Sequence, residues 1–259
     1  TISGGGRVFL SAVGILLMHA ADNVIAHNLI EGLYYTGISA GWVWGYGENV
    51  SKNNRIEYNR IRNIGQGRLS DMGGIYILGV QTGTTVRGNV ISGVKKKNYG
   101  GWGVYLDEGC SHVIVEDNLC YDISSQGFHV HYGRENIVRN NIFALGREGQ
   151  AALSRGEAHN SFTFTHNILL SRGGGPMFAM KEGSDKIIRS DLNLFWDMEG
   201  EAVVSADFRY EGGEFHFENE SPLAAWRAAS GNDLHSVVAD PLFVDAERGD
   251  FRLRPDSPA

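Results

Sequence analysis

The sequence predicts an all-β solenoid of stacked coils, and three observations support this class. An asparagine recurs at a spacing of 23 to 31 residues, an alternating run precedes most copies, and a glycine-bracketed segment follows about half a coil later. Periods in this range are typical of repeat architectures, and strand-forming units indicate about seven to eight stacked coils. The repeated asparagines are Asn28, Asn59, Asn89, Asn118, Asn141, Asn167 and Asn193.

The first predicted strand of each coil precedes the asparagine. Apolar and polar residues alternate there with period two, and β-branched residues are common, which is typical of half-buried strands. These runs are residues 23–27, 54–58, 84–88, 113–117, 136–140 and 162–166.

The second predicted strand is bracketed by glycines, which suit corners that need positive φ. These segments are residues 37–41, 74–79, 103–109, 127–133, 151–156 and 177–183.

The repeated asparagine itself predicts a structural corner. Its short side chain tolerates left-handed backbone geometry, and its amide can bond to the same amide one coil away, which would make a ladder.

The period breaks at about residue 197, so we expect residues 1–196 to form the coils and residues 197–259 to form an irregular C-terminal cap of the same domain. A helix is expected only near residues 222–229, ended by Gly231. Residues 240–245 and 249–253 are expected to cover the open end of the solenoid, whose exposed edge would otherwise invite pairing.

The composition argues against several partners. The net charge of −7 and the lack of a basic stripe argue against nucleic acid, and the run Lys95 to Lys97 is expected to be a solvated loop. The apolar residues 14–21 are too few to span a bilayer, so no membrane association is expected. Cys110 and Cys120 are expected to be unpaired thiols, because two cysteines make no disulfide framework. The chain starts at Thr1 inside a repeat, which indicates a fragment.

The second strands carry the candidate chemistry. Aligned by their closing glycines, they place Val104, Phe128 and Leu153 inward, and a one-residue slip of segment 151–156 would exchange its two faces. Neighbouring coils lie about 4.8 Å apart, so Asp107 and His131 are expected to be neighbours. The outer face and its strand ends gather Tyr76, Tyr105, Asp107, Glu108, His129, His131, Tyr132, Arg155, Lys181 and Glu182.

Two inserts, residues 62–72 and 93–102, emerge just before this face and are expected to form walls beside it. Trp102 lies in the second insert, and Trp42 and Trp44 lie on a neighbouring coil. Aromatic rings beside carboxylates suit sugars, whose C–H faces stack while their hydroxyls need hydrogen bonds. The alternative is that the tryptophans only pack loops onto the coils.

Glycoside hydrolysis needs two carboxylates, one as acid and one as nucleophile or base. Asp71 and Asp107 are the predicted pair, with Glu108 in reserve. On a straight strand Asp71 would lie roughly 20 Å from Asp107, so the chain must fold back across the face if the pair is correct.

The segments 70–76, 105–109 and 240–243 resemble right-handed parallel β-helix proteins of carbohydrate metabolism, most closely glycoside hydrolase family 141 and its relatives. The resemblance implies an all-β, right-handed parallel β-helix, a carbohydrate substrate of plant or host origin, no cofactor, and an extracellular or periplasmic location. Its known members include fucosidases and xylanases. The family's catalytic aspartates fall in motifs that match those around Asp71 and Asp107, whereas Met72 and Glu108 depart from them.

Three alternatives stay open. A polysaccharide lyase would use Lys181, Arg155, His131 or Tyr132 as base, with a Ca²⁺ ion neutralising the uronate. His129, His131 and Asp107 are a possible metal-binding set, although we predict no metal. A non-catalytic glycan-binding solenoid would keep the aromatics and tolerate the loss of both aspartates.

Overall fold

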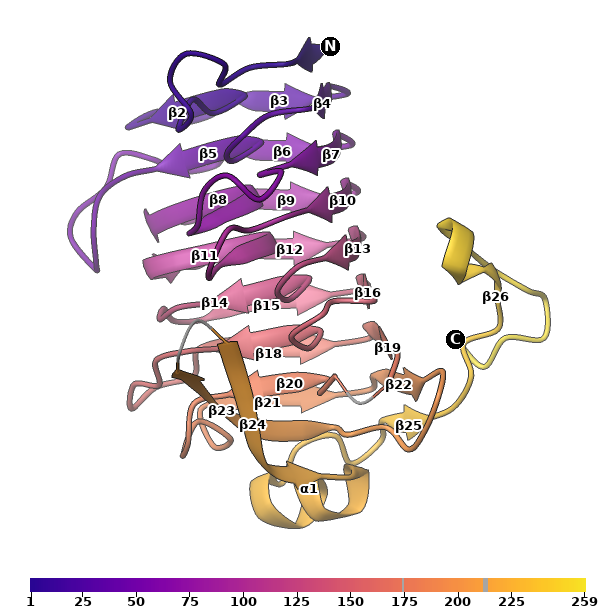
Figure 1. Ribbon diagram of the computed structural model, residues 1–259. Coiled ribbons are helices and arrows are strands. Elements are labelled where there is room, and N and C mark those ends of the chain that lie inside the picture. The colour runs from indigo at the N-terminus through magenta and orange to yellow at the C-terminus, as the bar shows by residue number, and fades with distance from the viewer. Residues whose placement is uncertain (174, 212–213) are drawn as a thin grey trace.

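The computed structural model describes residues 1–173, 175–211 and 214–259. The chain winds into stacked coils whose strands form three long sheets (Figure 1). Every pairing between successive coils in these sheets is parallel until the antiparallel pair at residues 205–221. The predicted all-β solenoid is therefore confirmed, and eight parallel strands in the second sheet fit the predicted seven to eight coils.

The first sheet was not predicted as a separate layer. It starts directly after each repeated asparagine, where two apolar residues had been read only as part of the asparagine motif. Its strands are β1 (Ile2–Ser3), β4 (Leu29–Glu31), β7 (Arg60–Ile64), β10 (Val90–Val94), β13 (Leu119–Ile123), β16 (Ile142–Ala144), β19 (Ile168–Ser171), β22 (Leu194–Asp197) and β25 (Val237–Val238).

The second sheet contains the six predicted glycine-bracketed strands, together with β2, β23 and β24, which were not predicted, and it carries the candidate site. Its strands are β2 (Ile15–Met18), β5 (Ile38–Gly41), β8 (Met72–Val80), β11 (Gly101–Ser111), β14 (Phe128–Val130), β17 (Ala151–Leu153), β20 (Phe178–Met180), β23 (Ser205–Glu211) and β24 (Glu214–Ser221).

The third sheet contains the six predicted strands that precede the asparagines, together with β21, which was not predicted. Its strands are β3 (Val24–Ala26), β6 (Arg55–Glu57), β9 (Thr85–Arg87), β12 (Ile114–Glu116), β15 (Asn136–Arg139), β18 (Phe162–Thr165) and β21 (Ile188–Asp191).

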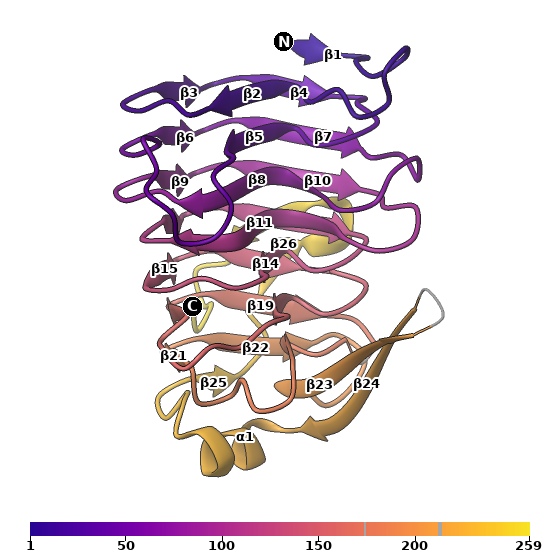
Figure 2. The same ribbon diagram turned by 90° about the vertical axis from the view of Figure 1, so that its left-hand side faces the viewer.

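The three sheets wind around one common axis (Figure 2). Alternate residues of each strand point inward and form the core between the sheets. Rings from all three sheets meet there: Phe128 and Phe178 of the second sheet, Phe143 of the first and Phe164 of the third are linked by ring-centroid distances of 5.2 to 6.0 Å. Because Ala151 pairs with Phe128 in the register, segment 151–156 has not slipped and its predicted inward face is confirmed.

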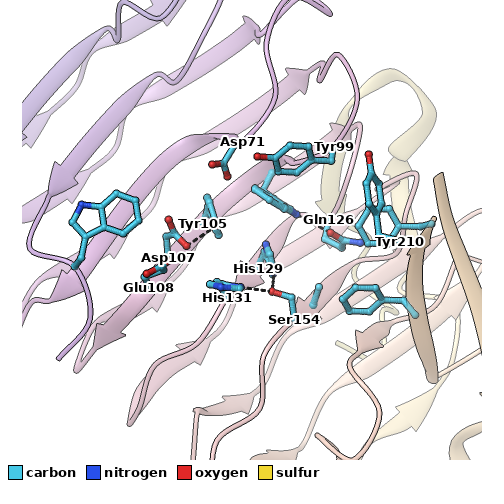
Figure 3. A pocket seen from close by; sticks show the side chains of 15 residues that line it. Asp71, Tyr99, Tyr105, Asp107, Glu108, Gln126, His129, His131, Ser154 and Tyr210 are labelled. Carbon is cyan, nitrogen blue, oxygen red and sulfur yellow. Dashed lines mark hydrogen bonds between the residues drawn. The ribbon is translucent and has the colours of Figure 1, made fainter. Parts of the chain in front are cut away.

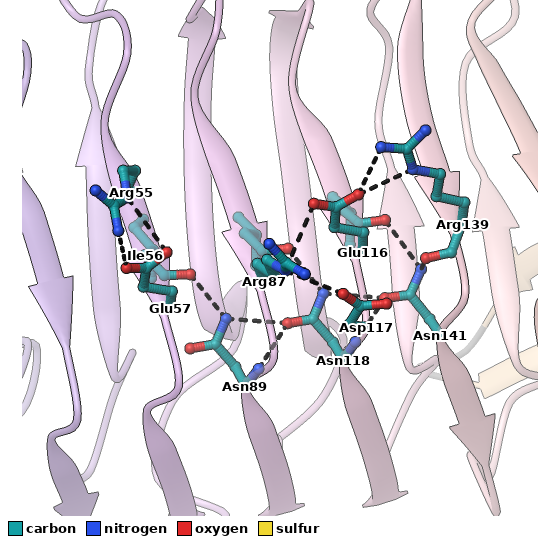
Figure 4. A network of polar contacts seen from close by, with 12 residues as sticks. Arg55, Ile56, Glu57, Arg87, Asn89, Glu116, Asp117, Asn118, Arg139 and Asn141 are labelled. Atoms are coloured by element: carbon teal, nitrogen blue, oxygen red, sulfur yellow. Dashed lines mark hydrogen bonds and ion pairs between the residues drawn. The ribbon is translucent and has the colours of Figure 1, made fainter.

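The predicted asparagine ladder is present (Figure 4). At each rung the backbone N–H and the side-chain amide both donate to the Oδ1 of the asparagine one coil further on, as Asn89 does to Asn118 at 2.9 and 3.0 Å. The series runs without a break from Asn28 to Asn193. It ends there, because the backbone N–H of Asn193 donates to Ser236 Oγ at 2.8 Å. The ladder therefore satisfies buried backbone donors that the tight corners leave without strand partners.

Left-handed backbone geometry was predicted for the repeated asparagines, and this prediction is wrong by one residue. The positive φ belongs to the residue before each asparagine, as in Tyr58 with φ 54° and Leu192 with φ 60°. The chain turns at that residue, so the following asparagine points inward, where its amide meets the next coil. Such φ values cost a bulky residue of order 1 kcal/mol or more, and the ladder keeps the corner in place.

We expect Asn118→Ala to lower the free energy of unfolding by about 2–5 kcal/mol. The substitution removes the acceptor for Asn89 and the donor to Val86 O, which leaves buried groups unpaired. Urea unfolding followed by circular dichroism measures the change.

Asn28→Ala is the matched control, since Asn28 starts the ladder, is only partly buried, and donates to Asn59 without accepting in turn. We expect it to cost about 1 kcal/mol. Equal losses for the two variants would contradict a buried ladder as the source of stability.

Glycine serves two purposes in the second sheet. Gly41 ends β5, and Gly79 and Gly109 lie close to the ends of β8 and β11; their φ values of 105°, 81° and 77° are those predicted for corners. Gly74 and Gly103 have ordinary φ but no room for a side chain, because a Cβ would approach Ile91 Cγ2 to 2.4 Å and Gly127 O to 2.3 Å.

The end of the core is closed by α1 (Leu223–Ser230), which ends at Gly231 in the left-handed region, as predicted. Trp226 is buried on the last coils, with its ring centroid 5.8 Å from that of Phe178. The expectation that residues 240–245 and 249–253 cover the end is wrong. β26 (Phe243–Asp245), the short 3₁₀ helix η1 (Ala246–Arg248) and β27 (Asp250–Leu253) lie beside the first sheet (Figure 1). Their apolar residues cover its outer side, where Phe243 and Phe251 pack with Ile168 and Leu170.

Both cysteines are free and buried, as expected. Among the described residues, no helix has the length and apolar character needed to cross a membrane.

Candidate active site

The outer face of the second sheet forms the floor of a cavity of about 560 Å³ (Figure 3). Tyr105 of β11 and His129 of β14 line the cavity, and Tyr76 of β8 stands beside Tyr105 without lining it, as the register and the cavity lining show. The tyrosine ring centroids are 4.7 Å apart, and the rings of Tyr105 and His129 stack at 5.0 Å. The cavity lies within the size range of about 300–1,000 Å³ that is usual for small-molecule sites.

Asp107 lies in this floor and is only 4% exposed. Both of its carboxylate oxygens accept hydrogen bonds from phenols: Tyr105 donates to Oδ1 at 2.7 Å and Tyr76 donates to Oδ2. Burial, followed by the charge of Asp107, raises the pKa of each phenol far above its ordinary value. The two tyrosines therefore remain hydrogen-bond donors that hold the Asp107 carboxylate in one orientation.

Asp71 points into the same cavity from the residue before β8 (Figure 3). Its φ is 58°, and its backbone is fixed by Tyr35, whose hydroxyl donates to Asp71 O at 2.7 Å. This left-handed corner turns the side chain across the face, so the 20 Å separation of a straight strand does not apply. The structure brings Asp71 and Asp107 together in one cavity, as the predicted pair requires.

The environment of Asp71 favours its protonated form. Burial, and then the negative charges of Asp107 and Glu108, raise its pKa from 3.8 to about 6, while the nearby hydroxyl of Tyr105 opposes part of the rise. Burial and like charges both disfavour a carboxylate, so the direction of the pKa shift has a clear cause.

Glu108 lines the opposite side of the cavity together with Trp44. Its Oε2 accepts a hydrogen bond from the Tyr132 hydroxyl at 3.2 Å. Tyr132 thus supports Glu108 from behind and does not itself line the cavity.

Two aromatic walls flank the carboxylates. Trp44, 59% exposed, forms one wall, and Trp102 with Tyr99 begins the other. The ring of Trp102 is locked by its Nε1–H, which donates to Gln126 Oε1 at 2.8 Å. Trp44 and Trp102 therefore both reach the cavity, as sequence reasoning proposed.

Sequence reasoning missed the aromatic residues of the β23–β24 hairpin, which complete the second wall. Phe208, Tyr210 and Phe215 line the cavity, and Tyr210 meets Tyr99 edge-on at 6.1 Å. The available signal was the pair of alternating aromatic runs on either side of Gly212-Gly213, which is typical of a hairpin.

The Lys95 to Lys97 run is not wholly solvated, contrary to expectation. The Lys96 side chain is only 12% exposed, forms an ion pair with Glu148, and lies 5.2 Å from the ring of Phe215. Lys96 thereby ties the hairpin to the body of the solenoid.

Several predicted substrate-binding residues lie elsewhere. Lys181 and Glu182 are exposed and line a separate depression with Arg155. Their strands β17 and β20 end before these positions, so the outward alternation does not carry over to them. Trp42 packs on Tyr76, with ring centroids 5.6 Å apart, and does not itself line the cavity.

Within the described ranges, no three His, Cys, Asp or Glu side chains come close enough together to hold a metal ion. The proposed set of His129, His131 and Asp107 is therefore not assembled as a metal site. Asp107 is directed at two phenols and both histidines at Ser154.

A family model described as right-handed beta helix region matches residues 64–192. The protein is a right-handed parallel β-helix. The chain is also similar to the uncharacterized protein YwoF of Bacillus subtilis (strain 168), with 26% identity over 192 residues. That match covers 62% of this chain and 41% of YwoF, so it spans less than half the length of that relative. No solved structure gives a significant match.

Because the pKa of Asp71 is raised on folding, the free energy of unfolding of the β-helix should depend on pH. Because the folded pKa of about 6 exceeds the unfolded value of 3.8, the native state binds the proton more tightly. Stability therefore falls as pH rises from about 4 to about 6. The shift of about two units corresponds to about 3 kcal/mol, and solvent screening of this partly exposed group reduces it to about 1–2 kcal/mol.

We accordingly expect Asp71→Asn to raise the free energy of unfolding by about 1–2 kcal/mol at pH 7 and to change it little at pH 4. Urea titrations at the two pH values measure this. Asp117→Asn is the control, since Asp117 has nearly the same φ of 59° but lies at the corner that follows β12 of the third sheet, beside Arg87. A gain of the same size in both variants would point to backbone preference in place of charge.

Proposed function

We propose that this β-helix is a glycoside hydrolase that acts on a polysaccharide or oligosaccharide, with Asp71 as general acid and Asp107 as nucleophile or base. The observation that carries the proposal is that two carboxylates line one aromatic-walled cavity, Asp71 with a raised pKa and Asp107 held by two phenols. A carboxyl group whose pKa is raised by its surroundings is typical of a general acid.

Asp71 supplies the proton in this scheme. With a pKa of about 6 it holds a proton in about half of the molecules at pH 6 and in about a tenth at pH 7, and donates it to the departing glycosidic oxygen as the bond to the anomeric carbon breaks. The carboxylates of Asp107 and Glu108 keep that proton on Asp71 until the substrate takes it.

Asp107 acts on the anomeric carbon in the same scheme, either directly or through a water. Tyr76 and Tyr105 hold its carboxylate in a fixed direction, so little reorientation is needed as positive charge develops on the sugar ring. Glu108, which is held by Tyr132, adds negative charge beside the same position.

The walls suit a sugar. Trp44, Tyr99 and Tyr210 expose aromatic surface to the cavity that holds the carboxylates, which supports stacking of sugar rings beside the scissile bond. We propose that the protein meets its carbohydrate substrate outside the cytoplasm, in the extracellular space or the periplasm.

The cavity favours hydrolysis over elimination. Of the four bases considered for a lyase, Arg155 and Lys181 line a different depression and Tyr132 stands behind Glu108. The described residues that line the cavity include three carboxylates and neither lysine nor arginine, which is a poor setting for a uronate.

A panel of plant and mucin glycans tests the proposal. New reducing ends without ultraviolet absorbance are the expected result. Absorbance at about 235 nm would instead show the unsaturated uronate made by a lyase. Binding without any product would show a glycan-binding module and would end the hydrolase proposal.

A further inference from the structure

Two histidines share one serine on the floor of the cavity. Ser154 Oγ lies 2.9 Å from His129 Nε2 and 2.9 Å from His131 Nδ1 (Figure 3). A hydroxyl has a single proton and can donate to only one of the two imidazoles. Among the described residues the Ser154 hydroxyl has no other acceptor, so it accepts from one imidazole and donates to the other. Which histidine donates decides what His131 presents to the substrate.

The surroundings of His129 decide the direction. The side chain is 5% exposed, and its Nδ1 is buried without a hydrogen-bond partner among the described residues. The ring lies parallel to that of Tyr105, within 3°, so an N–H in its plane does not aim at that aromatic face. Burial, and then His131, lower the pKa of His129 well below its ordinary value, which leaves one proton on the ring.

That proton belongs on Nε2. A proton on Nδ1 would bury an N–H with no acceptor, and orphaned buried N–H groups are rare in proteins. With the proton on Nε2, His129 donates to Ser154 Oγ. The hydroxyl of Ser154 then donates to His131 Nδ1, so a neutral His131 carries its own proton on Nε2.

His131 Nε2 has no hydrogen-bond partner in the described ranges, and the His131 side chain lines the cavity. Because Val130 pairs with Leu106, His131 follows the register to the position beside Asp107. We propose that the Nε2–H of His131 donates a hydrogen bond to a hydroxyl of the sugar held at Asp107, and that Ser154 and His129 are positioning residues that fix this tautomer.

The role given to the sugar rests on the proposed function, whereas the tautomer does not. The same tautomer bears on mechanism, since an imidazole that carries its proton on Nε2 cannot take a proton from the substrate with that nitrogen. His131 was the remaining lyase base inside the cavity, and this arrangement makes it a donor.

Long-range ¹H–¹⁵N spectra of the ¹⁵N-labelled protein test the tautomer without any substrate. The measurement is made at alkaline pH, above the ordinary titration range of imidazole. We expect both His129 and His131 to carry the proton on Nε2. A proton on Nδ1 of His131 would overturn the proposal, whatever the hydrolysis assays show.

Ser154→Ala tests the relay. We expect the His131 signals to move to a mixture of the two tautomers and KM for the hydrolysed glycan to rise roughly three- to tenfold, with a smaller change in kcat. Ser154→Thr, which keeps the hydroxyl, is expected to restore the Nε2–H tautomer. An unchanged His131 tautomer in Ser154→Ala would show that the serine does not position it.

Titration of the labelled protein with D-xylose and L-fucose tests the donor role. We expect the His131 Nε2–H signal to shift, and His131→Phe to weaken binding of the same sugars roughly three- to tenfold. Sugar binding that leaves this signal unmoved, or no sugar binding, would overturn the donor role. A correct tautomer without hydrolysis of any glycan would instead count against the proposed function alone.

Discussion

Asp107→Asn should lower kcat by roughly 10²–10⁴-fold on any glycan that the wild-type protein hydrolyses. The amide cannot act as nucleophile or base, yet it has nearly the same shape as the carboxylate, and its oxygen still accepts a hydrogen bond from one of the two tyrosines. Because the substrate-binding walls are untouched, we expect KM to change by a much smaller factor. Initial rates of reducing-end release measure both constants.

The matched control is Asp117→Asn, which makes the same chemical change at the corner after β12, away from the cavity. It is expected to keep wild-type activity. Hydrolysis that survives in Asp107→Asn would remove Asp107 from the reaction, and a loss shared by both variants would indicate a folding defect in place of a catalytic one.

The pH dependence of kcat/KM should have an alkaline limb near pH 6, set by the raised pKa of Asp71. The acid works only in its protonated form, so activity is present below this value and falls about tenfold for each pH unit well above it. Rates measured from pH 4 to 9 on one glycan locate the limb.

Asp107 contributes to that limb through its charge, which gives the prediction a second test. In Asp107→Asn the negative neighbour is gone, so the pKa of Asp71 is expected to move down toward 3.8, while burial keeps it above that value. Carboxyl ¹³C chemical shifts of the labelled variant follow the titration directly. An unchanged pKa of Asp71 would mean that the charge of Asp107 does not affect its ionisation.

Much of this architecture is readable from the chain because it repeats. Asn28 to Asn193 mark the corners, and alternation places Tyr105, Asp107 and His129 on one outer face, since a strand has a side-chain period of two. The register then follows from stacking equivalent positions, which is why Asp107 and His131 fall beside each other.

The remaining features depend on local geometry that does not repeat. Asp71 reaches Asp107 through a single left-handed corner, and neither spacing nor alternation encodes that turn. Lys181 and Glu182 follow strands that end early, so extrapolated alternation misplaces them. Phe208, Tyr210 and Phe215 lie in a hairpin that follows the repeat, about 100 residues beyond Asp107 in sequence.

That hairpin has a consequence for how such a site can change. Among the described strands β23 pairs with β20 of the solenoid, and β24 pairs only with β23. The aromatic side chains of the hairpin can be exchanged without altering β8 or β11, the strands that position Asp71, Asp107 and Glu108. In the proposed hydrolase, the choice of glycan can therefore change through the hairpin while the carboxylates that act on the bond stay the same.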